Sequence, residues 1–288
     1  MDFKVEFEQF NKEYPMKTKK AGGLMFNYRL GGTGERTLVL LVGGLGLSDT
    51  FYNHFKAFAE RYTVLTFDYP AETDDNSVLA DGIAVLLKEL GLGKVFLVGQ
   101  SYGGLIAQVI AKRHPEITAG LVLSNTGCLD SAMDVAAKQP MTDMMKGLKK
   151  TVLMTRIVPM FQLRGTFLKR MEKHFTQCTP EEKQYLLDLS RYMFGRLTNR
   201  HERHMCSLMI DLVHQTDIIG QDFAYLDGRV LLLLSEDDHT FGEGVKNALV
   251  YMMPAPVVRT DISGGHLALL LKIDVYIRTV CSFLDGLE

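Results

Sequence analysis

One short stretch constrains the fold of this chain more than any other. The apolar run 95–98 breaks at Gly99-Gln100-Ser101-Tyr102-Gly103 and passes directly into a helical pattern over 105–111. Glycines two positions before and two after Ser101 remove the Cβ atoms that would collide where a strand turns sharply into a helix. The Ser101 hydroxyl then stands above the sheet edge, beside the positive end of the helix dipole. The pattern predicts a nucleophilic serine in a strand-to-helix elbow.

Strand-like and helix-like runs alternate along most of the chain, which is typical of a mostly parallel sheet flanked by helices. Strands are expected near residues 24–30, 37–42, 63–67, 94–98, 119–124, 229–234 and 256–261. Helices are expected near 51–60, 76–91, 102–113, 242–252 and 266–285. At the N-terminus, Phe3, Val5 and Phe7 alternate with charged residues, and this alternation predicts an antiparallel edge strand over 3–10.

The segment from 130 to 220 differs in character, because it has long helix-compatible runs and no convincing strand. Thr179-Pro180-Glu181-Glu182 predicts a helix start, with threonine as the N-cap and proline at the first helical position. Ten of the fifteen methionines fall in this segment. They would suit an adaptable apolar pocket, and they would equally suit simple filling between packed helices.

Composition excludes several classes of protein. The 32 basic and 34 acidic residues nearly balance, and no basic stripe stands out, so nucleic acid is not expected as a partner. Charged residues interrupt the first thirty positions, and no run of 18 apolar residues exists, so neither a signal peptide nor a membrane span is expected. The four cysteines are widely spaced along the chain, at Cys128, Cys178, Cys206 and Cys281. They are expected to be reduced, which suits a cytoplasmic protein.

Further motifs follow in a fixed order along the chain: Gly43-Gly44-Leu45-Gly46 after the strand 38–42, Asp68-Tyr69-Pro70 after the next strand, Glu236-Asp237-Asp238 after the strand 231–234, and Gly264-Gly265-His266 before the last helix. In these motifs and in the Ser101 elbow, the chain resembles the α/β-hydrolase superfamily over about residues 24–127 and 228–287. The resemblance implies an α/β-hydrolase core of residues 1–129 and 221–288, with residues 130–220 as a helical cap.

Serine chemistry needs a nucleophile, a base that takes its proton and an acid that orients the base. The order Ser, Asp, His that this fold implies is met by Ser101, Asp238 and His266. Among eight histidines, only His266 lies in a glycine-rich turn before a late helix. The acid is less constrained, since Asp237 is the alternative in the same turn, and Asp130 is the next candidate if both fail.

The resemblance also implies an oxyanion hole formed by two backbone N–H groups. One belongs to Tyr102, directly after the nucleophile, and the other is expected from Leu45 in the loop after strand 38–42. This loop departs from the family pattern, because Gly43-Gly44 replaces the usual His-Gly. The donor is a backbone group and does not need that histidine. Rigidity of the loop must therefore come from elsewhere in the molecule.

These features predict a capped serine hydrolase that cleaves a small, largely apolar ester-like molecule through an acyl-enzyme. No cofactor is expected. No metal is expected either, because the pair His201 and His204, with Glu202 beside it, has helical spacing but no further ligand in view. Other reactions use the same scaffold, so C–C bond hydrolysis, a lyase, a cofactor-free oxygenase or a non-catalytic ligand-binding member stay open as alternatives. The oligomeric state is left open as well.

Overall fold

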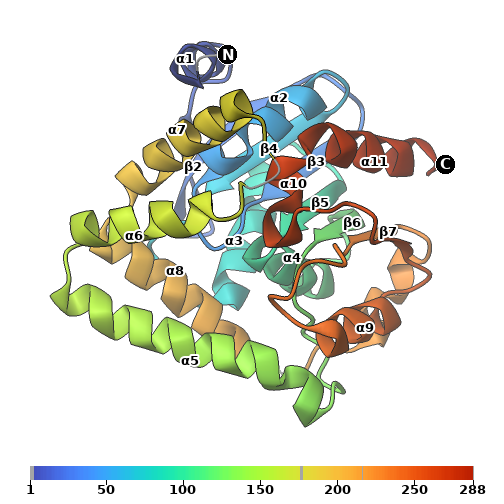
Figure 1. Ribbon diagram of the computed structural model, residues 1–288. Helices are drawn as coiled ribbons and strands as arrows, with labels where there is room; N and C mark the ends of the chain where they lie inside the picture. Colours follow the sequence, from blue (N-terminus) through green and yellow to red (C-terminus); the bar gives the residue numbers. More distant parts are fainter. Residues whose placement is uncertain (1–2, 176–177, 216, 288) are drawn as a thin grey trace.

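The computed structural model describes residues 3–175, 178–215 and 217–287, and its centre is an eight-stranded sheet (Figure 1). The strand order across the sheet is β1-β2-β4-β3-β5-β6-β7-β8. In chain order the strands are β1 (Lys17–Ala21), β2 (Leu24–Gly31), β3 (Thr37–Leu41), β4 (Thr63–Asp68), β5 (Val95–Gln100), β6 (Thr118–Ser124), β7 (Val230–Leu233) and β8 (Val257–Arg259). β1 and β2 are antiparallel to their neighbours, and the pairs from β4 to β8 are all parallel.

Helices cover both faces of this sheet, so its central strands are buried on both sides. Helices α2 (Tyr52–Ala59) and α11 (Ile273–Asp285) pack together on one face, while α3 (Asn76–Glu89) and α4 (Tyr102–Arg113) pack together on the other (Figure 1). Helix α9 (Glu243–Met252) follows β7. These strands and helices begin and end close to their expected positions, which confirms the predicted mostly parallel α/β architecture.

Four longer helices lie between β6 and β7: α5 (Val135–Ile157), α6 (Met160–Glu172), α7 (Pro180–Arg196) and α8 (Asn199–Asp211). Helix α5 packs on α8, and α6 packs on α7, beside the sheet layer (Figure 1). The predicted helix start at Thr179 is confirmed, because its side chain accepts the Glu182 N–H while the Glu182 carboxylate accepts the Thr179 N–H. This part of the chain is helical, as expected.

Short turns of helix complete the chain: η1 (Ser48–Phe51), η2 (Leu212–His214), η3 (Gly220–Leu226), η4 (Gly265–Leu267) and α10 (Ala268–Leu271). The single helix expected over 266–285 is therefore three successive pieces, η4, α10 and α11. Within the described ranges, no helix is both long enough and apolar enough to cross a membrane.

The expected edge strand over 3–10 is wrong, since these residues lie in α1 (Phe3–Glu13). Phe3, Phe7 and Phe10 follow helical spacing and are all buried, whereas Val5, which the alternation also required to be buried, is 62% exposed. The antiparallel edge of the sheet is β1 instead. Its sequence, Lys-Thr-Lys-Lys-Ala, carries too few apolar residues to show an alternation.

Candidate active site

The elbow at Ser101 has the geometry that its glycines permit. Ser101 joins β5 to α4 with φ 53° and ψ −119°, a backbone conformation that non-glycine residues seldom adopt. A Cβ at Gly99 would lie 2.2 Å from the Gly103 carbonyl oxygen, and one at Gly103 would lie 1.9 Å from that of Leu41. Only glycine therefore fits at either position, and the tight turn presents the Ser101 side chain at the carboxyl end of the sheet.

Three predicted side chains meet at this point although they are far apart in sequence. His266 Nε2 lies 3.0 Å from Ser101 Oγ, and His266 Nδ1 lies 2.9 Å from Asp238 Oδ2. With Nδ1 protonated, the imidazole donates to the carboxylate and accepts from the hydroxyl. Asp238 follows β7 and His266 lies in η4, so each side chain reaches the site from a loop at the same edge of the sheet as Ser101.

The surroundings of Asp238 favour its ionised form. The carboxyl is almost fully buried, and burial alone would raise its pKa; the hydrogen bond and charge of His266 and the N–H of Thr240, 2.9 Å from Oδ1, outweigh this and lower the pKa. The other acidic candidates lie elsewhere. Asp237 is exposed and accepts the Gly264 N–H at 2.9 Å, and Asp130 accepts the Ala132 N–H at 2.9 Å.

Two amide side chains that the sequence analysis missed hold the histidine loop. Asn125 donates to the Gly265 carbonyl at 2.8 Å and bonds Ser235 through both its amide nitrogen and its oxygen. Gln100, next to Ser101, donates to the His266 carbonyl at 3.2 Å. Gln100 is the last residue of β5, and Asn125 directly follows β6. A polar residue where a buried strand ends is the sequence signal that could have identified them.

The loop after β3 lies against Ser101. Gly46 N–H donates to the Gly43 carbonyl at 3.0 Å, and a Cβ at Gly43 would lie 3.6 Å from that of Ser101. In the described chain, the N–H groups of Tyr102 and Leu45 have no hydrogen-bond partner. Both amides are thus free to donate to another molecule.

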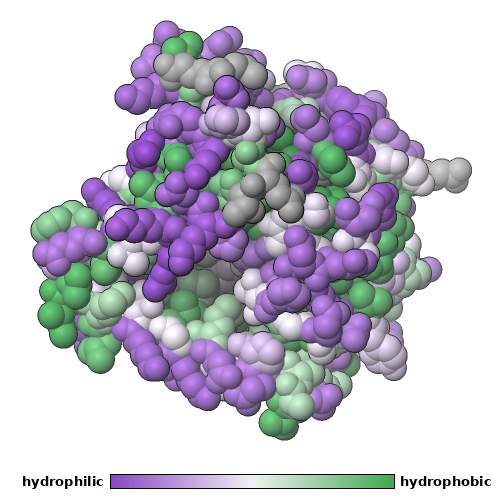
Figure 2. All heavy atoms as spheres, in the orientation of Figure 1, coloured by the Kyte–Doolittle hydropathy of each residue, from purple (hydrophilic) through white to green (hydrophobic). Residues whose placement is uncertain are grey.

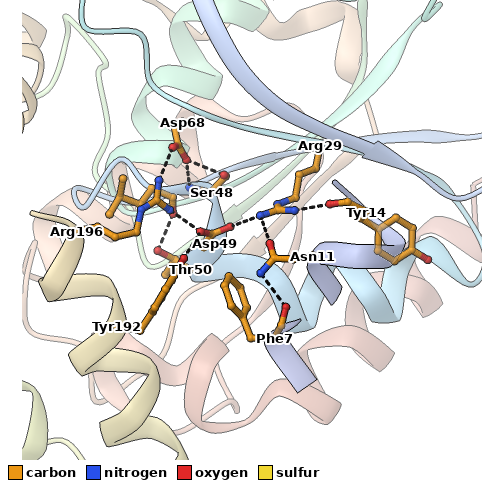
Figure 3. Close-up of polar contacts among 11 residues, drawn as sticks. Phe7, Asn11, Tyr14, Arg29, Ser48, Asp49, Thr50, Asp68, Tyr192 and Arg196 are labelled. Carbon is orange, nitrogen blue, oxygen red and sulfur yellow. Dashed lines mark hydrogen bonds and ion pairs between the residues drawn. The ribbon is translucent and has the colours of Figure 1, made fainter. Parts of the chain in front are cut away.

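Ion pairs hold the far end of this loop (Figure 3). Asp68 Oδ1 accepts both the N–H and the hydroxyl of Ser48, each at 2.7 Å, and Asp68 Oδ2 lies 3.0 Å from Arg196 Nη2. Arg196, on α7, also pairs with Asp49, whose other oxygen lies 3.0 Å from Arg29 Nη2. Burial alone would lower the pKa of Arg196, but the charges of Asp68 and Asp49 raise it. These contacts supply rigidity that the missing His-Gly pair does not.

Helix α8 contacts the same loop from the other side. The Nε2 atom of His201 lies 2.6 Å from the Leu45 carbonyl oxygen and can donate to it. A Cβ at Gly46, where φ is 67°, would lie 2.3 Å from the sulfur of Met205. His201 therefore contacts the loop backbone, and no group of three or more His, Cys, Asp or Glu suited to a metal occurs among the residues described.

A cavity of about 320 Å³ lies between the end of β6 and the inserted helices. Three methionines line it, Met133, Met141 and Met145, together with a few polar groups. Met141 and Phe241 flank Gly127, since a Cβ there would lie 3.3 Å from Met141 Cε and 3.1 Å from Phe241 Cε1, and the Phe241 ring centroid lies 5.9 Å from that of His266. Other methionines of this segment, such as Met193, are buried between helices. Some methionines of this segment therefore line a cavity, and others fill space between packed helices.

The four cysteines are free thiols. Cys128 lines the cavity, and burial raises the pKa of its thiol to about 12, as it does for Cys206. A thiol with so high a pKa is a poor nucleophile near neutral pH.

Comparison with known proteins gives a family and a set of shared folds. The model of the α/β-hydrolase fold family matches residues 36–272. A 2-hydroxy-6-oxononadienedioate/2-hydroxy-6-oxononatrienedioate hydrolase of Burkholderia vietnamiensis is 32% identical over 139 residues, 44% of this chain and 48% of that protein. A dihydrolipoyllysine-residue acetyltransferase component of an acetoin cleaving system from Pseudomonas putida is 30% identical over 147 residues, 46% of this chain and 40% of that protein. The chain thus spans less than half the length of these curated relatives.

Solved structures extend the likeness over nearly the whole chain. An enol-lactonase from Burkholderia xenovorans superposes with a TM-score of 0.73 at 16% identity, covering 94% of this chain and all of that one. An epoxide hydrolase from Bacillus megaterium superposes with a TM-score of 0.74 at 17% identity, with the same coverage. At such identities the likeness establishes the fold alone.

Proposed function

The chain belongs to the α/β-hydrolase family, and we propose that it is a serine hydrolase that cleaves a small, largely apolar ester-like substrate through an acyl-enzyme. The observation that carries this proposal is the unbroken chain of hydrogen bonds from Ser101 through His266 to Asp238. Such a chain joins a nucleophile, a base and an orienting acid. In this proposal Ser101 is the nucleophile, His266 the general base and Asp238 the acid that fixes the imidazole tautomer.

In the first half-reaction, Ser101 Oγ attacks the carbonyl carbon of the ester while its proton passes to His266 Nε2. The carbonyl oxygen becomes an oxyanion, and the free N–H groups of Tyr102 and Leu45 donate to it. The C–O bond to the alcohol then breaks, and His266 returns the proton to the departing alcohol. Asp238 stays ionised and stabilises the imidazolium that forms in between.

In the second half-reaction, water attacks the acylated Ser101 and gives its proton to His266. A second oxyanion forms in the same place and collapses, which breaks the bond between the acyl carbon and Ser101 Oγ. The proton on His266 returns to Ser101, and the carboxylic acid leaves. One ester and one water thus yield one acid and one alcohol, without any cofactor.

The cavity beside Met141 is the proposed site for the acyl group. Its lining is mostly apolar, and it is linked to His266 through Gly127 and Phe241. Thioether side chains adapt to ligands of different shape, so a range of short to medium acyl chains would fit. We assign residues 130–220 as the cap that encloses this substrate, and the reduced state of the four cysteines supports a cytoplasmic location.

A panel of p-nitrophenyl esters of graded chain length tests the proposed reaction. Turnover should rise with acyl length until the cavity is filled and should then fall. If no ester is cleaved although Ser101 reacts with a fluorophosphonate, the site cleaves another bond, and C–C hydrolysis becomes the leading alternative. A protein that neither cleaves an ester nor reacts with the probe would be a ligand-binding member of the family.

A further inference from the structure

The near balance of charge over the whole chain conceals one strongly basic segment. Between Asp143 and Glu172 the sequence contains seven basic residues and no acidic residue. They are Lys146, Lys149, Lys150, Arg156, Arg164, Lys169 and Arg170. The segment forms the second half of α5 and nearly all of α6. The sequence analysis missed it because a net charge of −2 averages this run with acidic regions elsewhere.

Large apolar side chains are exposed in the middle of this basic segment. Leu153 is 60% exposed, Ile157 79% and Phe161 69%, and Met154 beside them is also exposed. These residues lie where α5 ends and α6 begins, and we call this region the α5–α6 corner. Figure 2 shows apolar residues gathered at the edge of the molecule where Figure 1 places this turn between the helices. Water contacts these side chains at a free-energy cost that a partner would remove.

The cations and the apolar side chains share one face of α5. Lys150, Leu153 and Ile157 are spaced three and four residues apart, which places them one above another on a helix surface. The opposite face carries Thr155, which is buried. The exposed face therefore changes from basic to apolar toward the corner.

Most of these cations have no counter-ion. Lys146 pairs with Asp143, and Arg164 donates to the Leu197 carbonyl. The other five are exposed and form no ion pair in the described part of the chain: Lys149, Lys150, Arg156, Lys169 and Arg170.

The neighbouring helix α8 adds to this positive field. Arg203 donates to the Thr155 carbonyl at 2.8 Å, and Arg200 is exposed. Glu202 lies between them in sequence and is half-buried, so the two arginines outnumber this acidic residue. The surface around the corner therefore has an excess of positive charge.

We propose that the α5–α6 corner docks on an anionic lipid surface. The apolar side chains would enter the boundary between headgroups and acyl chains, and the surrounding lysines and arginines would contact the lipid phosphates. The complementarity is twofold, because such a surface offers both negative charge and an apolar layer beneath it. The inference does not depend on which bond the Ser101 site cleaves.

Two other partners fit the corner less well. Nucleic acid would neutralise the cations, but it would leave the exposed leucine, isoleucine and phenylalanine in water. A second copy of the chain would cover the apolar side chains, but it would bring two sets of unpaired cations together. The anionic lipid surface is the partner that satisfies both features.

Vesicle co-sedimentation tests the proposal on the full chain. The protein should bind vesicles of mixed phosphatidylcholine and phosphatidylglycerol, and it should bind much less to phosphatidylcholine alone. Combined Leu153→Ser, Ile157→Ser and Phe161→Ser should weaken the partition coefficient at least about tenfold, because three apolar side chains no longer transfer from water. Combined Lys149→Gln, Lys150→Gln and Arg156→Gln should remove the dependence on phosphatidylglycerol and on salt.

Two exposed apolar residues outside the corner provide the matched control. Val135, at the other end of α5, is 83% exposed, and Tyr251, on α9, is 89% exposed. Combined Val135→Ser and Tyr251→Ser should leave vesicle binding unchanged. Circular dichroism and turnover of a soluble short-chain ester should be the same in every variant, because none of the substituted residues is among those lining the described cavity.

Three results would overturn the proposal. The first is equal binding to neutral and anionic vesicles, and the second is unchanged binding of the Leu153, Ile157 and Phe161 variant. The third is a dimer in sedimentation analysis that the same variant dissociates, since this would assign the corner to a second copy of the chain.

Discussion

The central sheet and the inserted helices bury their side chains very differently. Every residue of β3 and β5 is buried, whereas the 23-residue helix α5 buries only Met145 and Thr155. A side chain packed on all sides has one position, and shifting it disturbs many neighbours. A helix with few buried residues can move at lower cost. In our proposal the reacting groups belong to the rigid layer and substrate selection to the more adaptable one.

The inserted helices are not uniform in this respect, because α8 is tied to the sheet layer. Asn76, at the start of α3, donates to the Leu208 carbonyl and to the Asp211 carboxylate, each at 2.8 Å. Its oxygen accepts the hydroxyl of Tyr102 at 2.7 Å. Tyr102, the residue after Ser101, is therefore linked to α8 through Asn76. Removing residues 130–220 as one block would also remove these partners of Asn76 on α8.

The largest difference in turnover should lie between variants of two neighbouring residues, Asp238 and Asp237, in the turn after β7. Asp238→Asn should lower turnover on the order of 10⁴-fold, because the amide favours the wrong imidazole tautomer and cannot stabilise the imidazolium. Asp237→Asn should retain most activity, since this side chain is exposed and, among the residues described, its carboxylate accepts a hydrogen bond from the Gly264 N–H alone. Steady-state kinetics of both variants, with thermal melts to compare folding, give the test. If Asp237→Asn is the inactive variant, the acid is assigned to the wrong residue.

A smaller effect should arise where α8 contacts the rigid layer. His201→Ala removes the hydrogen bond to the Leu45 carbonyl. If this bond positions the Leu45 N–H, kcat should fall at least about tenfold with little change in KM, because oxyanion donors act in the transition state. Affinity for a trifluoromethyl ketone, which forms an oxyanion on Ser101, should fall in parallel.

The controls for this positioning role are on the same helix. His201→Gln keeps a side-chain donor and should restore part of kcat, whereas Arg200→Ala changes an exposed neighbour and should match the parent. Equal losses in kcat and in thermal stability, without a loss of ketone affinity, would leave His201 with a structural role only.

Within the adaptable layer, filling the cavity should change selectivity more than overall rate. Met141→Trp places a larger side chain in the cavity and should lower kcat/KM for longer acyl esters about tenfold, while the shortest esters are unaffected. Met154→Trp, on the same helix outside the cavity, is the control and should keep the parent profile. The same chain-length profile in all three proteins would place the acyl group elsewhere.

The last contrast concerns stability rather than turnover, and it involves a buried histidine. His54, on α2, is buried, and this burial lowers its pKa to about 4, although its hydrogen bond to the Leu269 carbonyl acts in the opposite direction. Above pH 6.5 both the folded and the unfolded states are neutral at this position, so the stability is fully present. As the pH falls toward 4, the unfolded chain binds a proton that the folded state does not. The free energy of unfolding should then fall by up to roughly 3 kcal/mol.

Urea unfolding at a series of pH values checks this sign. His54→Gln lacks the titrating group, so its stability should decline less with falling pH than that of the parent. His239→Gln, at an exposed position, should follow the parent curve. Parallel curves for the parent and His54→Gln would show that burial does not hold this imidazole neutral.

The same difference between layers explains what the sequence could predict. Buried strands such as β5 are continuous apolar runs, and the elbow requires glycine at fixed positions, so both are visible locally. At the N-terminus, Phe3 and Phe7 fit both a two-residue and a helical period, whereas Phe10 fits only the helical one and is buried in the aromatic core beside Phe55.

The contacts that hold the site could not be found in this way. Asn125 reaches Gly265 across 140 positions, and His201 reaches Leu45 across 156. Nothing in the local sequence of either residue specifies its partner, because the fold alone brings the two segments together. The sequence could identify the need for rigidity in the loop at Gly43, but it could not identify Arg196 as one of its sources.

Reaction of the parent protein with a fluorophosphonate tests the central claim most directly. The intact mass should rise by one phosphonyl group, peptide mapping should locate this group on Ser101, and ester turnover should be lost in proportion to labelling. Ser101→Ala should remain folded, resist the probe and lose turnover on the order of 10³-fold or more. Equal labelling of the parent and Ser101→Ala, or full ester turnover in Ser101→Ala, would contradict the assignment of Ser101 as the nucleophile.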